Sequence, residues 1–290
     1  MKKLFTLMAA VAAMVSCSEN VENTPTIPET DKLPINISTT LTRATDSAFE
    51  AGDKVGIFVV NEPKVLAASG NHVDNMGFTY STTWTPDSPI YWLDKTTKAD
   101  FYCYYPYGNP GSVTAYAFST YQDQTVLTNY KASDFIWGKA TGVAPTADLI
   151  NINTNHVLSN AIIYLRPGDG FTAESFAAAQ ISVGIRNVMT NAYINLSTGK
   201  ATATGSTYEV KPYFEGDYYR AVIVPQTVAD GSQLIVVTVN GVDYALKKGF
   251  TFLAGKQHKF TVNVNKTGSG VNVGVGDWEE DTEDNGGDAE

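Results

Sequence analysis

Apolar and polar residues alternate over short stretches between residue 34 and residue 264, as they do in half-buried β-strands. Ile35, Ile37 and Thr39 alternate with polar neighbours, and residues 54–60 form a denser apolar run behind the Gly52-Asp53 turn. The further stretches that favour strands are residues 90–92, 101–107, 134–138, 156–165, 181–188, 192–196, 218–224, 234–239 and 260–264.

Turn-forming residues separate these stretches. Asn240-Gly241, between two valines, is a strong signal for a tight β-hairpin. Pro167-Gly168-Asp169-Gly170 ends the stretch before it, and residues 171–180, with their alanines, are the best candidate for a helix. Many short strands with so little helix predict an all-β chain built of sandwiches rather than a parallel sheet.

The strand pattern is interrupted near residues 144–155, where the chain reads Ala144-Pro145-Thr146-Ala147-Asp148. We place a domain boundary in this interval. The prediction is an N-terminal β-sandwich domain of residues 34–150 and a C-terminal β-sandwich domain of residues 151–278.

The first residues differ from everything that follows. A head with two lysines precedes an apolar run over residues 4–15, and Ser16-Cys17 comes next, which is the layout of a secretory signal. The apolar run is too short to cross a bilayer as a helix. Because Cys17 stands where a lipoprotein signal peptidase cuts, we predict a lipoprotein signal peptide over residues 1–16 and acylation of Cys17. The alternative is an ordinary signal peptide with an incidental cysteine.

Charge and cysteine content narrow the function classes. The net charge is −10, and residues 277–290 hold eight acidic residues and no basic one. We expect residues 279–290 to form a disordered acidic tail and residues 17–33 a flexible tether. The remaining body has no basic stripe, which argues against a nucleic-acid partner. Cys103 is the one cysteine after Cys17, so no intramolecular disulfide forms, and a buried, inert thiol is expected.

Catalytic and metal-binding patterns are missing from the sequence. The three histidines are far apart, and the chain has no paired-cysteine motif, calcium loop, nucleophile elbow or phosphate loop. Glu215 and Asp217 flank Gly216 and could act as a carboxylate pair, but a hairpin turn is the stronger interpretation. We therefore predict no enzyme activity, no metal and no cofactor.

Eight segments in order carry a family resemblance. They are Thr42-Arg43-Ala44-Thr45, residues 49–58, Pro89-Ile90-Tyr91-Trp92, residues 99–107, residues 133–138, residues 156–161, residues 219–226 and residues 254–260. Together with the lipoprotein start, their order and spacing resemble the fimbrillin family. The resemblance is to the minor-fimbria-like lipoproteins that are subunits of type V pili.

This resemblance implies a fold and a mode of assembly. The fold would be two tandem transthyretin-like Greek-key β-sandwich domains. Subunits of this family are exported as lipoproteins, and an arginine-specific protease then removes the N-terminal segment with the first strand. A strand from another subunit fills the vacated groove, which is a form of β-augmentation. Because each joint is head-to-tail, it propagates into a filament instead of closing into a dimer.

The resemblance transfers to particular residues of this chain. Cleavage would fall between Arg43 and Ala44, and the alternative is that Arg43 is a plain surface arginine. The displaceable first strand would include Ile35, Ile37, Thr39 and Leu41. A candidate donor strand near the C-terminus contains Val271, Val273 and Val275, although it is short and leads into the acidic tail.

The leading hypothesis is therefore a non-enzymatic pilus or adhesin subunit at the cell surface, exported as an outer-membrane lipoprotein. Its partners would be other pilus subunits, membrane lipid through the acylated N-terminus, and a host or bacterial surface receptor. The sequence leaves anchor, stalk and tip roles open.

Two other hypotheses stay open. The runner-up is a surface lipoprotein that binds glycans through exposed aromatics, for which Tyr91, Trp92, Tyr102, Tyr104 and Tyr107 are candidates, although strand aromatics usually belong to a core. The third is a hydrolase with an unrecognised site. A groove beneath residues 35–41 would favour assembly, and an aromatic patch at a loop end would favour glycan binding.

Overall fold

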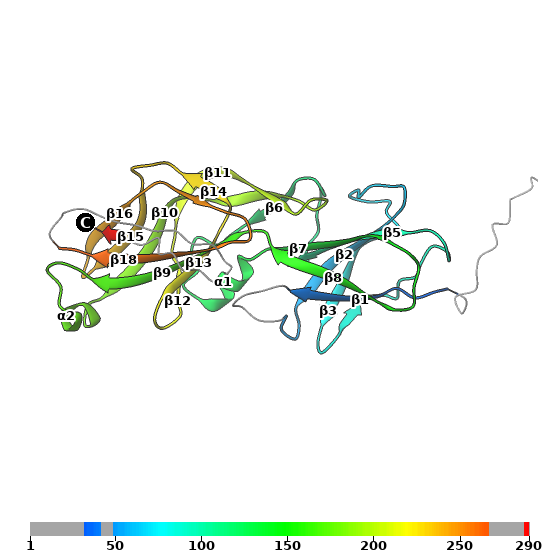
Figure 1. Cartoon of the computed structure of the whole chain (residues 1–290), viewed down its shortest axis with the longest axis horizontal. Coiled ribbons are helices and arrows are strands. Elements are labelled where there is room, and N and C mark those ends of the chain that lie inside the picture. The colour runs from blue at the N-terminus through cyan, green and yellow to red at the C-terminus, as the bar shows by residue number, and fades with distance from the viewer. Residues whose placement is uncertain (1–31, 42–48, 267–286, 290) are drawn as a thin grey trace, which may run out of the picture. The chain divides into compact units, whose positions relative to one another are not determined.

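A computed structural model describes residues 32–41, 49–266 and 287–289 (Figure 1). From Leu33 onward the chain forms one compact unit. Several predicted site residues lie outside the described residues: Cys17, Arg43, Ala44, Val271, Val273 and Val275.

The first sheet has seven strands in the order β1-β8-β7-β5-β2-β3-β4. Its strands are β1 (Asn36–Leu41), β2 (Lys54–Asn61), β3 (Val73–Tyr80), β4 (Trp84–Pro86), β5 (Ala99–Tyr105), β7 (Ile136–Val143) and β8 (Leu149–His156). All neighbouring strands are antiparallel except β1 and β8, which run parallel.

The later part of the chain supplies two further sheets and a short ribbon. One sheet has the order β11-β10-β15-β16, and β6 also pairs with β10. The other has the order β12-β13-β9-β18-β19, and β14 pairs with β17. The strands are β6 (Tyr116–Ser119), β9 (Ser159–Pro167), β10 (Ile181–Asn195), β11 (Lys200–Val210), β12 (Tyr213–Phe214), β13 (Tyr219–Ile223), β14 (Gln226–Val228), β15 (Gln233–Val239), β16 (Val242–Lys247), β17 (Phe250–Phe252), β18 (Gln257–Val264) and β19 (Gly287–Ala289).

Two short helices are described, α1 (Leu127–Ala132) and α2 (Ala173–Ala177). In α2 the Thr172 hydroxyl accepts a hydrogen bond from the Ser175 N–H, and the Ser175 hydroxyl accepts one from the Thr172 N–H. This reciprocal capping box satisfies N–H groups that a helix leaves unpaired at its start. The helix predicted within residues 171–180 is confirmed, and it covers Ala173–Ala177.

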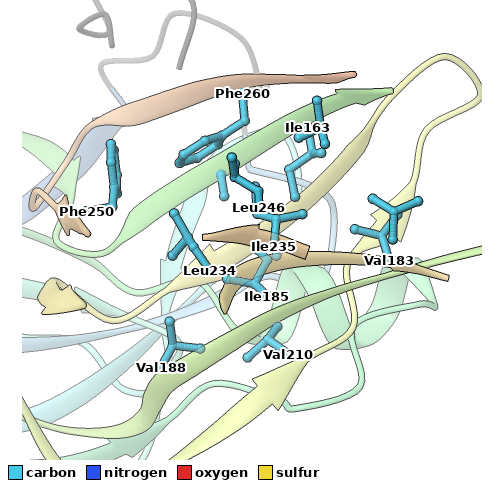
Figure 2. Close-up of a cluster of buried hydrophobic side chains, with 14 of the residues drawn as sticks. Ile163, Val183, Ile185, Val188, Val210, Leu234, Ile235, Leu246, Phe250 and Phe260 are labelled. Carbon is cyan, nitrogen blue, oxygen red and sulfur yellow. The ribbon is translucent and has the colours of Figure 1, made fainter. Parts of the chain in front are cut away.

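Three clusters of buried side chains hold the sheets together. One lies on one face of the first sheet and includes Ile57 and Val59, whereas Phe58 and Val60 of the same strand belong to a second cluster with residues of β10 and β13. β2 is buried on both faces, which explains its nearly continuous apolar sequence. The third cluster lies between the two later sheets, and Figure 2 shows its side chains filling the space between the strands.

The fold confirms the all-β prediction and the hairpin at Asn240-Gly241, where both residues have positive φ and join β15 to β16. Two strand predictions were wrong. Residues 90–92 form only an isolated bridge at Tyr91. Residues 156–165 are not one strand, because β8 ends at His156 and buried Val157 and Leu158 lead the chain into β9 of another sheet.

The interval assigned to the domain boundary contains a strand. β8 occupies Leu149–His156, and its buried residues, Ile150, Ile152 and Thr154, alternate with exposed asparagines. Only two of its residues on the buried face are strongly apolar, so the alternation was weak. The division into two domains at residue 150 stays a prediction.

Candidate functional site

β1 is an edge strand made by the first described residues, and it pairs with a strand from more than a hundred residues later in the chain. In Figure 1 it is the blue arrow beside β8. The register starts with Asn36 opposite Leu149 and continues without a bulge to Leu41 opposite Thr154. The predicted first strand is therefore part of a sheet and not a loose arm.

β8 depends on β1 for much of its pairing. β7 pairs with β8 only at its last three residues, Thr154–His156. Among the described strands, β1 alone forms a ladder with residues 149–153 of β8. Removing β1 would leave this part of β8 as an open edge of unpaired N–H and C=O groups.

Ile35, which directly precedes β1, and the inward side chains of β1 complete the core on one face of the first sheet. Ile35 and Ile37 are each 4% exposed, and Thr39 is 7% exposed. Ile35 and Ile37 share one core cluster with Ile150 and Ile152 of β8. Burying an isoleucine side chain stabilises a fold by about 1.5–3 kcal/mol. The burial of Ile35 and Ile37 therefore holds β1 against the rest of the sheet. Leu41 is in the strand, and its side chain is not described.

Residues 33–36, at the start of β1, also form hydrogen bonds with segments other than β8. The Ile35 N–H donates to the Ile90 carbonyl at 3.0 Å, and the Trp92 N–H donates to the Leu33 carbonyl at 2.9 Å. The Asn36 side-chain amide donates to the carbonyl of Ala147 at 3.0 Å. These contacts define the seat of β1, which is formed by residues 90–92, the loop before β8, and β8 itself.

Trp92 fixes one wall of this seat. Its side chain is 4% exposed, and its indole N–H donates to the Thr146 carbonyl at 3.0 Å. The bond ties residues 90–92 to the loop between β7 and β8. The sequence marked Ile90-Tyr91-Trp92 as a strand and Ala144–Asp148 as a break, but nothing in it indicated that the two touch.

The chain is fixed again just after residues 42–48. The Phe49 ring packs edge-on against Trp84 at 4.8 Å and Tyr105 at 5.9 Å between centroids. The Tyr105 hydroxyl donates to Asp53 Oδ1 at 3.2 Å, and burial together with nearby Asp53 raises the pKa of Tyr105. β1 and Phe49 thus hold the chain on the two sides of Arg43.

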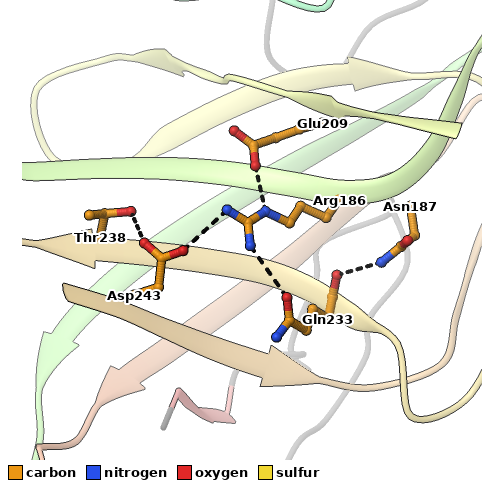
Figure 3. A network of polar contacts seen from close by, with 6 residues as sticks. All are labelled: Arg186, Asn187, Glu209, Gln233, Thr238 and Asp243. Atoms are coloured by element: carbon orange, nitrogen blue, oxygen red, sulfur yellow. Dashed lines mark hydrogen bonds and ion pairs between the residues drawn. The ribbon is translucent and has the colours of Figure 1, made fainter. Parts of the chain in front are cut away.

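A polar network lies on the sheet of β10, β11, β15 and β16 (Figure 3). The Arg186 guanidinium pairs with Glu209, and it also donates to Asp243 at 3.3 Å and Gln233 at 3.3 Å. The hydrogen bond to Glu209 raises the pKa of Arg186. The network joins four strands, and it offers no unpaired base or nucleophile of the kind that catalysis requires.

The carboxylate and histidine candidates do not converge. Glu215, Gly216 and Asp217 form the β12–β13 hairpin turn, as predicted, and Glu215 pairs with the largely buried Arg220. His72 contacts the Tyr91 carbonyl and His156 contacts Asp134, so these histidines serve separate local structures. Within the described part of the chain, no group of three metal-ligating side chains occurs.

Most of the aromatic candidates for glycan binding belong to the core. Trp92, Tyr102 and Tyr104 are buried, and only Tyr107 reaches 39% exposure. Lys54 lies over the Tyr107 ring at 4.7 Å. These residues therefore supply no flat aromatic patch.

Burial also raises the pKa of the Cys103 thiol, which matches the expected inert cysteine.

A second parallel edge strand is present at the other end of the chain. β19 pairs with β18 at residues 262–264 and also contacts β16. No pattern in the sequence predicts this strand, since the residues around it are acidic or small. None of the described helices is long and apolar enough to cross a bilayer.

The fold and this edge define a β-sandwich protein whose N-terminal strand pairs in parallel with a strand late in its first sheet. A family model described as fimbrillin-like matches residues 42–278. The chain belongs to the fimbrillin-like family, a class of structural subunits and adhesins of the cell surface.

Individual relatives agree with this family. The chain is 28% identical over 307 residues to a Bacteroides uniformis protein named fimbrium subunit Fim1C, with 96% of each chain covered. The crystal structure of a Bacteroides uniformis protein described as a cell adhesion protein superposes with a TM-score of 0.68 at 24% identity, covering 87% of this chain and all of that one. A corresponding Bacteroides ovatus structure gives a TM-score of 0.68 at 17% identity, covering 85% and 98%. These structures share the fold.

Proposed function

We propose that this chain is a fimbrial subunit that is exported as a lipoprotein through Cys17 and assembled by exchange of its first strand. Cleavage between Arg43 and Ala44 frees β1 together with the lipid. A strand from another subunit then takes the place of β1 beside β8. The single observation that supports this most is that β1 is the ladder partner of residues 149–153, with Ile37 of β1 and the preceding Ile35 buried in the core.

The position of Arg43 suits such a cut. It follows the last residue of β1, Leu41, by two positions and precedes Phe49 by six. Phe49 packs among Trp84 and Tyr105, and the Gly52 N–H donates to the Tyr80 carbonyl at 2.8 Å. A cut at residue 43 therefore separates β1 from a downstream chain that keeps its own contacts, and the rest of the sheet retains its anchor.

Loss of β1 creates a binding site with two components. The edge of β8 offers backbone donors and acceptors, and the core loses the side chains of Ile35, Ile37 and Thr39. An incoming strand that supplies both restores the buried area and the hydrogen bonds, so it binds strongly without any catalytic group. Joints of this kind are head-to-tail and extend into a filament.

The remaining parts of the proposal follow from this role. Other fimbrial subunits are the partners, the acylated N-terminus binds the outer membrane before cleavage, and a surface receptor is recognised by the assembled filament. The protein acts as a structural component of the cell surface and not as an enzyme.

The test is the intact mass of the cell-surface form. The proposal expects a product that begins at Ala44, and in an Arg43→Gln variant a retained, acylated product that begins at Cys17. Arg166→Gln is the matched control, because Arg166 is an exposed arginine on β9 and its loss leaves the cut unchanged. A wild-type surface form that keeps residues 18–43 would contradict processing at this site.

A further inference from the structure

The segment that leads into β1 forms hydrogen bonds on both of its sides. An antiparallel bridge centred on Pro34 joins residues 33–35 to residues 90–92. In this bridge, the Ile35 N–H donates to the Ile90 carbonyl at 3.0 Å. On the opposite side, the ladder with β8 begins one residue later. At this end the groove that β1 occupies therefore has two walls, β8 and residues 90–92, whereas along the rest of β1 the described residues form a ladder on the β8 side alone.

Residues 90–92, the second wall, have anchors of their own. The Trp92 indole N–H donates to the Thr146 carbonyl at 3.0 Å. His72 Nε2 lies 2.6 Å from the Tyr91 carbonyl, and it carries a proton there because a carbonyl oxygen only accepts. Neither bond involves β1, so we expect the second wall to stay in place when β1 leaves.

The second wall binds backbone groups at alternate residues of the strand. Because successive residues of a strand point their backbone groups to opposite sides, Leu33 and Ile35 face residues 90–92, and Pro34 faces away. Proline has no N–H, and at this position the second wall does not need one. A proline at the position of Ile35 would instead leave the carbonyl of the buried Ile90 without its donor.

The edge of β8 cannot make this distinction, because its ladder begins at Asn36. An open strand edge is a template for pairing with other chains, so a groove with this wall alone would bind unrelated extended segments as well. Leaving a buried acceptor without its donor lowers affinity by roughly five- to a hundredfold. The second wall therefore adds a selectivity that the edge of β8 lacks.

Pro34 also limits slipping of the strand along the groove. A shift by one residue turns every side chain to the wrong face, so the core excludes it. A shift forward by two residues keeps the faces, but it brings Pro34 opposite Leu149, where the strand faces β8 and proline offers no N–H. The two walls together thus fix where along the groove a strand of this kind binds.

We infer that residues 90–92 select the strand that replaces β1. They bind its backbone on the side away from β8, so the residue at the position of Ile35 must carry an N–H, and proline is accepted at the position before it. Trp92 is a positioning residue, since its indole holds the second wall to the Thr146 carbonyl. This inference rests on the proposed function, because it concerns the partner of the same groove.

The experiment uses the chain from residue 18 onward, cut at Arg43 and separated from the released segment under mild denaturant. Labelled peptides of residues 33–41 are titrated into this cut protein, and binding is followed by fluorescence anisotropy. In one peptide an ester replaces the amide between Pro34 and Ile35, which removes the Ile35 N–H and keeps every side chain. We expect it to bind about tenfold more weakly than the all-amide peptide.

The matched control peptide has its ester at the Ile37 N–H. This N–H points to the same side of the strand as that of Ile35, but it lies outside the bridge with residues 90–92. We expect the control ester to weaken binding by about twofold at most, because it removes no bond to the second wall.

A pair of protein variants tests the role of Trp92. Trp92→Phe removes the bond to Thr146 and keeps an aromatic ring in the core. It should weaken the all-amide peptide about fivefold and reduce the penalty of the Ile35 ester to about threefold, because a loosened wall has less to lose. Trp137→Phe is the matched control, since it removes an indole bond to the Leu196 carbonyl beside a different core cluster, and it should change neither quantity.

The outcomes separate the two proposals. If the all-amide peptide binds and the Ile35 ester binds equally well, the groove exchanges strands as proposed, but residues 90–92 do not select them and the inference is wrong. If Trp92→Phe weakens both peptides by the same factor, Trp92 has only a structural role and the inference is wrong as well. If no peptide binds a cut protein in which β9 and β18 stay protected from hydrogen exchange, the proposed function fails, and the inference fails with it.

A second measurement uses the uncut chain and decides the inference even if the cut protein does not stay folded. The Ile35 N–H should exchange slowly with solvent, since it donates to the Ile90 carbonyl. Trp92→Phe should speed this exchange about tenfold, and Trp137→Phe should leave it unchanged. Equal exchange of the Ile35 N–H in the two variants would overturn the inference.

Discussion

The cores of the first sheet and of the two later sheets differ in how they are completed. The first includes Ile37 of β1 and the preceding Ile35, and β1 lies at the edge of its sheet beside a strand more than a hundred residues later in the chain. Among the described residues, the buried members of the other all lie between Ala161 and Val264. Loss of β1 would therefore remove residues from one of these clusters and none of the described residues of the other, and we expect a chain without β1 to keep a folded body.

The largest effect is expected where a charge enters the core of β1. Ile37→Asp places a carboxylate at a site that is 4% exposed, which costs several kcal/mol unless the strand leaves the sheet. We expect residues 33–41 to become sensitive to thermolysin while β9 and β18 stay resistant. Ser38→Asp is the control on the other face. Equal resistance of Ile37→Asp and the wild type would contradict the claim that burial of Ile37 holds β1 in the first sheet.

A pair of cavity-creating substitutions tests whether the two cores are independent. Ile152→Ala in the first core and Ile163→Ala in the other remove the same atoms from fully buried sites, and each should lower the free energy of unfolding by about 2–5 kcal/mol. Only Ile152→Ala should also weaken binding of a peptide of residues 33–41 to the cut protein. Denaturant titration measures the first quantity and anisotropy the second. A similar loss of peptide affinity in both variants would mean that the cores are not independent.

A smaller, stabilising change is expected at Thr39. Thr39→Val removes a buried hydroxyl that has no described partner, so stability of the first core should rise by about 1 kcal/mol. Urea unfolding followed by tryptophan fluorescence can detect it, with Ser38→Ala as the neutral control. A destabilisation of similar size would show that the hydroxyl is satisfied in solution.

The smallest effect concerns the polar network of the later sheets. The hydrogen bond from the Thr238 hydroxyl, with help from Arg186, lowers the pKa of Asp243. A carboxyl whose pKa is lowered by folding contributes stability above its unfolded pKa and loses it as the pH falls through the folded pKa. Asp243 is half exposed, so Asp243→Asn should remove at most about 1 kcal/mol at pH 7 and almost nothing near pH 2. Asp217→Asn, in an exposed turn, is the control. A pH-independent difference would contradict this origin.

The sequence was sufficient for features that depend on local pattern. The all-β class, the Asn240-Gly241 hairpin, the short helix near residue 175 and the turn at Gly216 all follow from alternation or turn chemistry. The strand at residues 35–41 was predicted from the same alternation, and the structure adds that it pairs with β8.

The parts that could not be predicted depend on contacts between distant segments. β8 was hidden because three of its outward positions are asparagines, the fourth is an exposed leucine, and one of its three buried residues is a threonine. The seat of β1 joins residues 33–35 to residues 90–92 and to Ala147, and no local signal encodes such pairings. In the sequence, Phe49 is only one residue of the segment 49–58. Its packing against Trp84 and Tyr105 shows that it holds the chain on the C-terminal side of Arg43.

The most direct test of the account is amide hydrogen exchange of the chain before and after cleavage at Arg43 and removal of the released segment. The account predicts that residues 149–153 of β8 lose protection after removal, that β9 and β18 keep theirs, and that an added peptide of residues 33–41 restores the protection of β8. Unchanged protection of residues 149–153 after β1 has gone would contradict the claim that this strand closes the groove.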